Sequence, residues 1–122
     1  MTTHEHDDIF DAAARILLEE ERCITIGFSP DGVTIRFPTT RKLAEHLGIP
    51  HYYVLPRFGD MERDGLIRRV ERVGISTTAS GTRKLLAVIA ERYGERAKEV
   101  LGPDIYSALQ ARAAVPGCQD GD

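Results

Sequence analysis

Cysteine is scarce in this sequence, and tryptophan is absent. The two cysteines, Cys23 and Cys118, are far apart and form no CxxC pair, which excludes a zinc motif and a disulfide framework. No apolar run reaches the roughly 18 residues that a membrane span requires, and the first residues lack the basic and apolar pattern of a secretion signal. We therefore expect an intracellular, cytoplasmic protein with reduced thiols and no membrane association.

Charge of one sign does not dominate the chain either. Its 122 residues are 42% hydrophobic and 29% charged, with a net charge of −3, which is typical of one globular domain. The charges are nevertheless separated along the chain. Residues 1–22 have a net charge of −5, whereas residues 51–84 have seven bases, four acids and a net charge of +3. This basic segment indicates where an anionic partner would bind.

Catalytic and cofactor motifs are also missing. The sequence has no glycine-rich phosphate loop, no Ser-His-Asp arrangement and no pair of carboxylates with catalytic spacing. His4, His6, Asp7 and Asp8 could form a metal site only within residues 1–8, where the chain is polar and close to its end. We therefore expect no enzymatic activity, no cofactor and no bound metal.

Hydrophobic periodicity predicts an α+β fold that is mainly helical. Apolar residues recur at helical spacing over residues 8–21, which predicts an N-terminal helix. Two alternating runs, at 23–28 and 33–37, flank the turn residues 30–32 and predict a β-hairpin. Alternate residues of each run are apolar, so Ile24, Ile26 and Phe28 share one face and Val33, Ile35 and Phe37 share another.

The rest of the chain alternates helices with one short hairpin. Thr39 or Thr40 can cap the first of these helices and Gly48 can end it, while Thr78 can cap a later one. The predicted elements are, in order, a helix over 39–47, a helix that begins near Pro50, strands over 66–72 and 75–77, a long helix over 79–101 and a last helix over 104–114.

Three sequence motifs follow one another in the middle of the chain. The first, LAEHLGI at 43–49, places the small Ala44 where two helices cross closely and Gly48 where the turn needs a positive φ. The second, MERDGLIRR, covers 61–69, and the third, TTASG, covers 77–81. In order and spacing, these motifs resemble the winged helix-turn-helix transcription regulators of the multiple-antibiotic-resistance (MarR) type and the related PadR type.

The sequence departs from that family in three places. Pro56 stands in the second helix, where a proline removes one backbone hydrogen bond and costs ~3 kcal/mol. We therefore expect this helix to be kinked or to begin late. The predicted β-wing is very short, and the hairpin at 23–37 is longer than the single strand usual at that point.

The resemblance implies a winged-helix domain over residues 8–101, followed by a C-terminal helix over 102–114. We expect the segments 1–7 and 115–122 to be disordered. The helices after residue 78 carry more apolar residues than one small domain can cover. We therefore expect them to pair two copies of the chain into a homodimer, with help from residues 8–21.

The function implied by this resemblance is sequence-specific binding of double-stranded DNA, and we expect a homodimeric transcriptional regulator. The second helix would lie in the major groove, and its first residues would contact base edges. Basic residues around it would contact phosphates. The predicted DNA-contacting residues are Thr40, Arg41, His51, Tyr52, Tyr53, Arg57, Arg69 and Arg72.

The same surface supports a second hypothesis, in which the winged helix is a protein-interaction module that does not bind DNA. Tyr52, Tyr53 and Leu55 would then pack on a protein partner. Scattered arginines often pair with carboxylates of the same molecule, and Glu62 and Asp64 are available for such pairs. Salt dependence distinguishes the two hypotheses, because phosphate binding always releases counterions.

Overall fold

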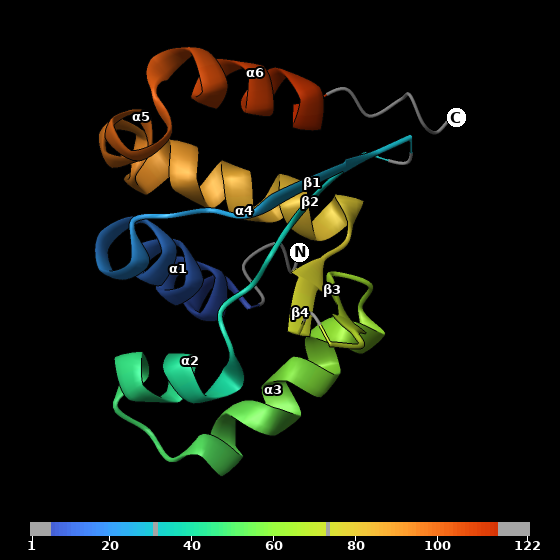
Figure 1. Cartoon of the computed structure of the whole chain (residues 1–122). Helices are drawn as coiled ribbons and strands as arrows, with labels where there is room; N and C mark the ends of the chain where they lie inside the picture. Colours follow the sequence, from blue (N-terminus) through green and yellow to red (C-terminus); the bar gives the residue numbers. More distant parts are fainter. Residues whose placement is uncertain (1–5, 31, 73, 115–122) are drawn as a thin grey trace.

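The computed structural model describes residues 6–30, 32–72 and 74–114 (Figure 1). These residues form the expected mainly helical α+β fold, with six α-helices and two β-hairpins. The elements are, in chain order, α1 (Asp7–Arg15), which continues into the wider π-helical segment η1 (Ile16–Glu21), β1 (Ile26–Ser29), β2 (Gly32–Ile35), α2 (Thr40–Leu47), α3 (His51–Arg63), β3 (Ile67–Val70), β4 (Gly74–Thr77), α4 (Ala79–Arg92), α5 (Gly94–Leu101) and α6 (Pro103–Ala114). No helix in this described part is long and apolar enough to cross a membrane.

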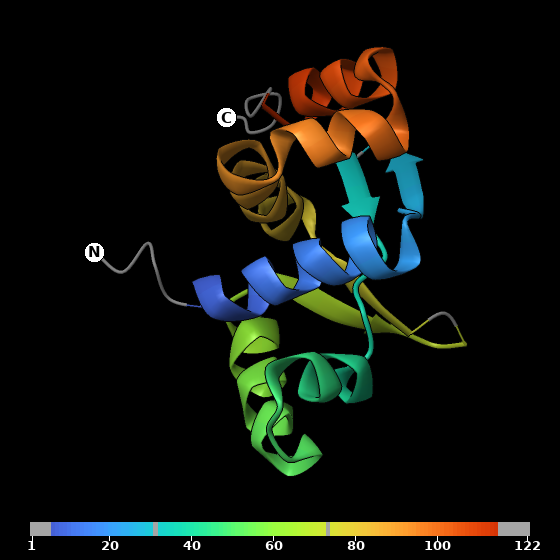
Figure 2. The same ribbon diagram turned by 90° about the vertical axis from the view of Figure 1, so that its left-hand side faces the viewer.

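Helix α1 occupies the middle of the molecule (Figures 1 and 2). Helix α4 packs on one side of α1, and α5 and α6 stack on α4. On the other side of α1 lies α2, which packs against α3. The β3–β4 hairpin follows α3 and projects from the body between these two groups of helices, as Figure 2 shows.

The alternating pattern of the second predicted strand is confirmed in the core. Val33, Ile35 and Phe37 are all buried. Phe37 packs edge-on between two other buried rings, at 5.4 Å from Phe10 of α1 and 5.8 Å from Phe58 of α3, measured between ring centroids. Burial of three aromatic rings at one point stabilises the contact among α1, α3 and the segment that precedes α2.

The two hairpins are joined just beyond β2. Arg36 forms an isolated antiparallel bridge with Ser76 of β4. The backbone N–H of Phe37 donates to the carbonyl oxygen of Ile75 (2.8 Å). The segment that leads into α2 therefore lies beside β4, and β4 in turn pairs with β3.

The predicted helix ends are confirmed on both sides of α2 and at the start of α4. The Thr39 side chain accepts from the backbone N–H of Lys42 (3.1 Å), and Gly48 ends α2 with a φ of 70°. The Thr78 side chain accepts from the backbone N–H of Gly81 (3.1 Å) at the start of α4. Each threonine cap pairs a backbone donor that the helix itself leaves free.

The single long helix predicted over 79–101 is wrong, because the chain forms two helices that meet at Tyr93. This residue has φ −132° and ψ 24°, outside the helical region, and α5 begins at Gly94. The Tyr93 hydroxyl donates to Asp11 of α1 (2.8 Å) and accepts from Arg15 (3.3 Å). These bonds to α1 and the low helix propensity of glycine together account for the break.

Pro56 lies inside α3, which begins at His51, so the expectation of a late start is wrong. Both Pro56 and Tyr52 are exposed. The carbonyl group of Tyr52, which lacks its usual donor, therefore lies on the solvent side of the helix, where water can replace the missing bond. A kink at this position stays a prediction.

The fold begins earlier than expected. Helix α1 starts at Asp7, and His6 is only 6% exposed, with its Nε2 atom 2.9 Å from Asp64 Oδ2. The expected disorder of residues 1–7 is therefore wrong for His6 and Asp7. Residues 1–5, 31 and 115–122 lie outside the described residues. The disorder expected for 1–5 and 115–122 is therefore not described, and neither are the turn residue Asp31, His4 and Cys118.

Five apolar residues of the C-terminal helices are covered within one chain, whereas Ile105 of α6 is 55% exposed. Leu85, Leu86 and Ile89 of α4, Ala97 of α5 and Leu109 of α6 are all buried. The argument that these helices carry surplus apolar surface is therefore wrong for these five residues. A homodimer stays a prediction, and it needs a surface outside this set.

Candidate nucleic-acid interface

Helix α3 has one buried and one exposed face. Val54 and Phe58 point into the core and are fully buried. On the other face, Tyr52, Tyr53 and Leu55 are 65%, 57% and 42% exposed. The rings of Tyr52 and Tyr53 lie 4.7 Å apart, measured between centroids. We call Tyr52, Tyr53 and Leu55 the α3 patch, and its outward orientation agrees with the helical register read from the sequence.

Two predicted contact residues meet where α2 and α3 begin. The Thr40 hydroxyl oxygen lies 2.7 Å from Nε2 of His51, and both residues are half-buried. This hydrogen bond links the first turns of the two helices. Thr40 and His51 therefore have a structural role in orienting α3 beside α2.

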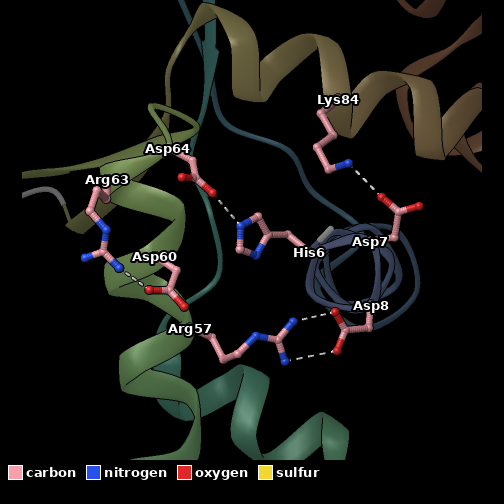
Figure 3. Close-up of polar contacts among 8 residues, drawn as sticks. All are labelled: His6, Asp7, Asp8, Arg57, Asp60, Arg63, Asp64 and Lys84. Atoms are coloured by element: carbon pink, nitrogen blue, oxygen red, sulfur yellow. Dashed lines mark hydrogen bonds and ion pairs between the residues drawn. The ribbon is translucent and has the colours of Figure 1, made fainter. Parts of the chain in front are cut away.

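Arg57 is held by a carboxylate of α1. Its guanidinium forms two hydrogen bonds with Asp8, at 2.7 Å and 3.2 Å (Figure 3). The hydrogen bond from Arg57 is the main reason that the pKa of Asp8 is lowered, and Asp8 likewise raises the pKa of Arg57. Because the pKa of the Asp8 carboxyl is lowered in the folded state, the pair contributes stability at neutral pH. This contribution is lost as acid protonates Asp8.

Asp8 is the last of three consecutive residues that connect the start of α1 to α3, to the residue after it and to α4 (Figure 3). His6 contacts Asp64 after α3, Asp7 pairs with Lys84 of α4 at 2.7 Å, and Asp8 pairs with Arg57. The described residues contain no group of three or more His, Cys, Asp or Glu placed to hold a metal ion. Asp7 and Asp8 pair with the cationic side chains of Lys84 and Arg57.

The remaining predicted phosphate contacts fall into two groups. Arg69 of β3 donates to Glu62 of α3 (3.3 Å) and is therefore already paired. Arg41 and Arg72 are exposed, and neither side chain forms a hydrogen bond or ion pair within the described part of the chain. Arg72 also has a positive φ of 69°, at the turn between β3 and β4.

The sequence did not identify Arg36 and Arg68 as candidate phosphate contacts, although they resemble Arg41 and Arg72 in exposure and in the absence of a charged partner among the described residues. Both are exposed and lack an ion pair among the residues that the structure describes. The alternation over 33–37 could have identified Arg36, because a residue between the buried Ile35 and Phe37 must point to the opposite face.

Replacing Asp8 with Asn should strengthen binding to duplex DNA, if Arg57 lies at a DNA interface. The change frees the Arg57 guanidinium for a phosphate, so the salt dependence should steepen by about one unit and the affinity should rise roughly three- to tenfold at low salt. Fluorescence anisotropy with a labelled duplex would measure both quantities. The free energy of unfolding should fall by only about 0–1 kcal/mol, because the pair is exposed.

Asp104→Asn is the matched control for this change. It removes the same charge from an exposed position of α6 and should leave the salt dependence unchanged. Equal effects of the two variants would show that only the net charge matters, and that Arg57 does not contact DNA.

The chain matches no protein-family model and no curated protein. The function is therefore inferred from the α3 patch and from the basic residues around it.

Proposed function

We propose that this chain is a winged helix-turn-helix protein of the MarR and PadR type that binds double-stranded DNA sequence-specifically in the cytoplasm as a transcriptional regulator. The order of elements supports this proposal: α2 and α3 form the helix pair, and the β3–β4 hairpin follows as a short wing. The bridge between Arg36 and Ser76 adds a third strand segment beside the wing.

The observation that carries the proposal is the two-sided nature of α3. Its buried face fixes the helix on the body, and its α3 patch is exposed, where a groove could receive it. Helix α3 itself lies at one end of the molecule (Figure 1). Tyrosine hydroxyls can hydrogen-bond base edges, and Leu55 can pack on a thymine methyl group. Arg41 and Arg72, which have no carboxylate partner in the described region, would contact phosphates.

Two substitutions should affect binding differently. Arg72→Ala should weaken binding to all duplexes alike and reduce the salt slope by about one, because a phosphate contact carries no base information. Tyr53→Ala should reduce sequence preference, with a loss of roughly 1–3 kcal/mol at the contacted base pair. Anisotropy titrations against a duplex selected from a random pool and against an unselected duplex, over a range of salt, would measure these effects.

Arg96→Ala provides a control on α5, away from α3, and should change neither quantity. If Tyr53→Ala weakened binding to both duplexes equally, Tyr53 would not read sequence.

The alternative function is a protein-interaction module, and two observations favour it. Arg57 and Arg69 are paired with carboxylates, and the α3 patch is aromatic and aliphatic and contains no basic residue. In that case, the α3 patch would dock a protein partner. Failure of the wild-type protein to bind any duplex at low salt would exclude the DNA proposal and leave this alternative.

We also propose a homodimer, because a symmetric pair would match a pseudo-palindromic DNA site. Phe28 and Ile105 are 63% and 55% exposed on β1 and α6, and they supply apolar surface for such contact. Light scattering should give twice the mass of one chain at micromolar concentration. A monomer under these conditions would remove the argument for a symmetric DNA site.

A further inference from the structure

Three polar residues form a row across the strands at the base of the wing. Arg36 bridges Ser76 of β4, and Ser76 pairs with Arg68 of β3. Residues directly opposite each other on neighbouring strands project from the same face of a sheet. Arg36 and Arg68 therefore flank Ser76 on one face, and we call these three residues the Arg36–Ser76–Arg68 row.

This face is directed toward solvent, because the residues that alternate with the row are buried. Ile35, Thr77 and Ile67, which precede or follow the row along the three segments, are 0%, 0% and 3% exposed. The side chains of Arg36 and Arg68 are on the opposite face and are exposed. The row therefore lies on the accessible face of this sheet.

The charges of the row are not neutralised within the described part of the chain. Neither Arg36 nor Arg68 forms an ion pair there, whereas three other arginines of this region do: Arg57 with Asp8, Arg63 with Asp60, and Arg69 with Glu62. Two arginines on either side of one small neutral residue repel each other mildly unless an anion lies between them.

We propose that the Arg36–Ser76–Arg68 row binds a backbone phosphate of duplex DNA. This inference rests on the proposed DNA-binding function and assigns phosphate contacts that the sequence did not suggest. Guanidinium groups bind phosphate oxygens through paired, charge-assisted hydrogen bonds, and a serine hydroxyl can add a third donor. Among the residues that the structure describes, the Ser76 hydroxyl makes only a long contact of 3.5 Å, with the carbonyl oxygen of Ile35, so it can turn to a phosphate.

The proposal also changes which side of the wing faces DNA. Arg69, the neighbour expected to contact phosphate, lies opposite Ile75 on the other face and is paired with Glu62. Arg68 takes its place in the interface. Together with Arg72 at the turn, the row would extend phosphate contact from the tip of the wing to the segment that enters α2.

The test compares two double variants of the full chain. Binding of a labelled duplex is measured by anisotropy between about 50 and 200 mM salt, where counterion release is readily seen. Arg36→Gln with Arg68→Gln should lower the affinity at least roughly tenfold and reduce the salt slope by about one to two. The control, Arg63→Gln with Arg69→Gln, removes the same charge from arginines that are already paired, and should lower the affinity less than about threefold.

The outcomes separate this inference from the proposed function. If the wild-type protein binds duplex and the two double variants bind equally well, the row does not contact phosphate, but the DNA-binding function stands. If the wild-type protein binds no duplex at low salt, the function itself is wrong, and the assignment of the row to DNA falls with it.

A measurement on the wild-type protein covers the case in which the double variant does not fold. Addition of the duplex should shift the NMR signals of the Arg36 and Arg68 Nε–H groups and leave that of Arg63 in place. Signals of Arg36 and Arg68 that stay unchanged at saturating duplex would overturn the assignment.

Discussion

Replacing Gly81 with Ala is expected to lower the free energy of unfolding by about 3 kcal/mol or more, because α4 passes directly over the chain at Leu66. A Cβ atom at Gly81 would overlap the carbonyl oxygen of Leu66 and lie 2.9 Å from its carbonyl carbon. That carbonyl oxygen cannot move freely, since it accepts a hydrogen bond from the backbone N–H of Thr78 (3.0 Å). The Thr78 hydroxyl also donates to the carbonyl oxygen of Gly65 (2.6 Å). Urea unfolding monitored by circular dichroism would measure the loss.

Gly59→Ala is the matched control, because Gly59 also lies within a helix. A Cβ atom there meets nothing within 4 Å, so the variant should gain about 0.5–1 kcal/mol from the better helix propensity of alanine. Opposite signs for the two variants would show that the close approach to Leu66, and not glycine flexibility, explains the glycine in the motif at 77–81. A Gly81→Ala protein as stable as the wild type would contradict the geometry.

The parts of the fold that follow from local chemistry could be predicted from the sequence. Thr39 and Thr78 cap helices because a side-chain oxygen pairs a nearby backbone N–H, and Gly48 takes up its positive φ without strain. The alternation around Ile35 likewise identified a buried strand face.

The breaks and ends that depend on distant residues could not be predicted. The division between α4 and α5 at Tyr93 depends on its hydrogen bond with Asp11, which is 82 positions away in the sequence. The ordered state of His6 depends in the same way on Asp64. Periodicity cannot show such contacts, because it reports only which face of an element is apolar.

The candidate interface likewise has features that could be predicted from the sequence and features that could not. Helical register alone was sufficient to place Tyr52 and Tyr53 outside, and both are exposed. Register could not show that Arg57 is held by Asp8, since these residues are 49 positions apart. Register also could not place Arg36 and Arg68 on the two sides of Ser76, because these pairings join segments that precede and follow α2 and α3.

The base of the β3–β4 hairpin is fixed by a buried chain of hydrogen bonds. The backbone N–H of Ile35 donates to the Thr77 hydroxyl oxygen (2.8 Å), which lies 2.7 Å from the Thr82 hydroxyl oxygen. Thr82 in turn donates to the carbonyl oxygen of Val33 (2.6 Å). The single Thr82 proton can go to Val33 or to the carbonyl oxygen of Thr78 (2.9 Å), and in either case the Thr77 hydroxyl donates to Thr82, which sets the direction of the chain. It joins β2, β4 and α4.

Replacing Thr77 with Val should lower the free energy of unfolding by about 1–3 kcal/mol, the second large effect that we expect. Valine keeps the shape of the side chain but leaves the buried N–H of Ile35 without its acceptor, and an unpaired buried donor loses its full solvation. Chemical unfolding would measure the stability, and amide hydrogen exchange would follow Ile35 directly. The Ile35 amide should exchange faster than the fall in global stability alone requires.

Thr25→Val makes the same chemical change at an exposed position and should alter the stability by no more than about 0.5 kcal/mol. A Thr77→Val protein with unchanged stability and unchanged exchange at Ile35 would show that the hydroxyl chain does not hold the base of the β3–β4 hairpin. Loss of the hydrogen bond between Ile35 and Thr77 would also affect the candidate interface, because Thr77 is next to Ser76 in the sequence and Ile35 is next to Arg36. The hydrogen bond that Thr77→Val removes is therefore one that keeps the Arg36–Ser76–Arg68 row in register.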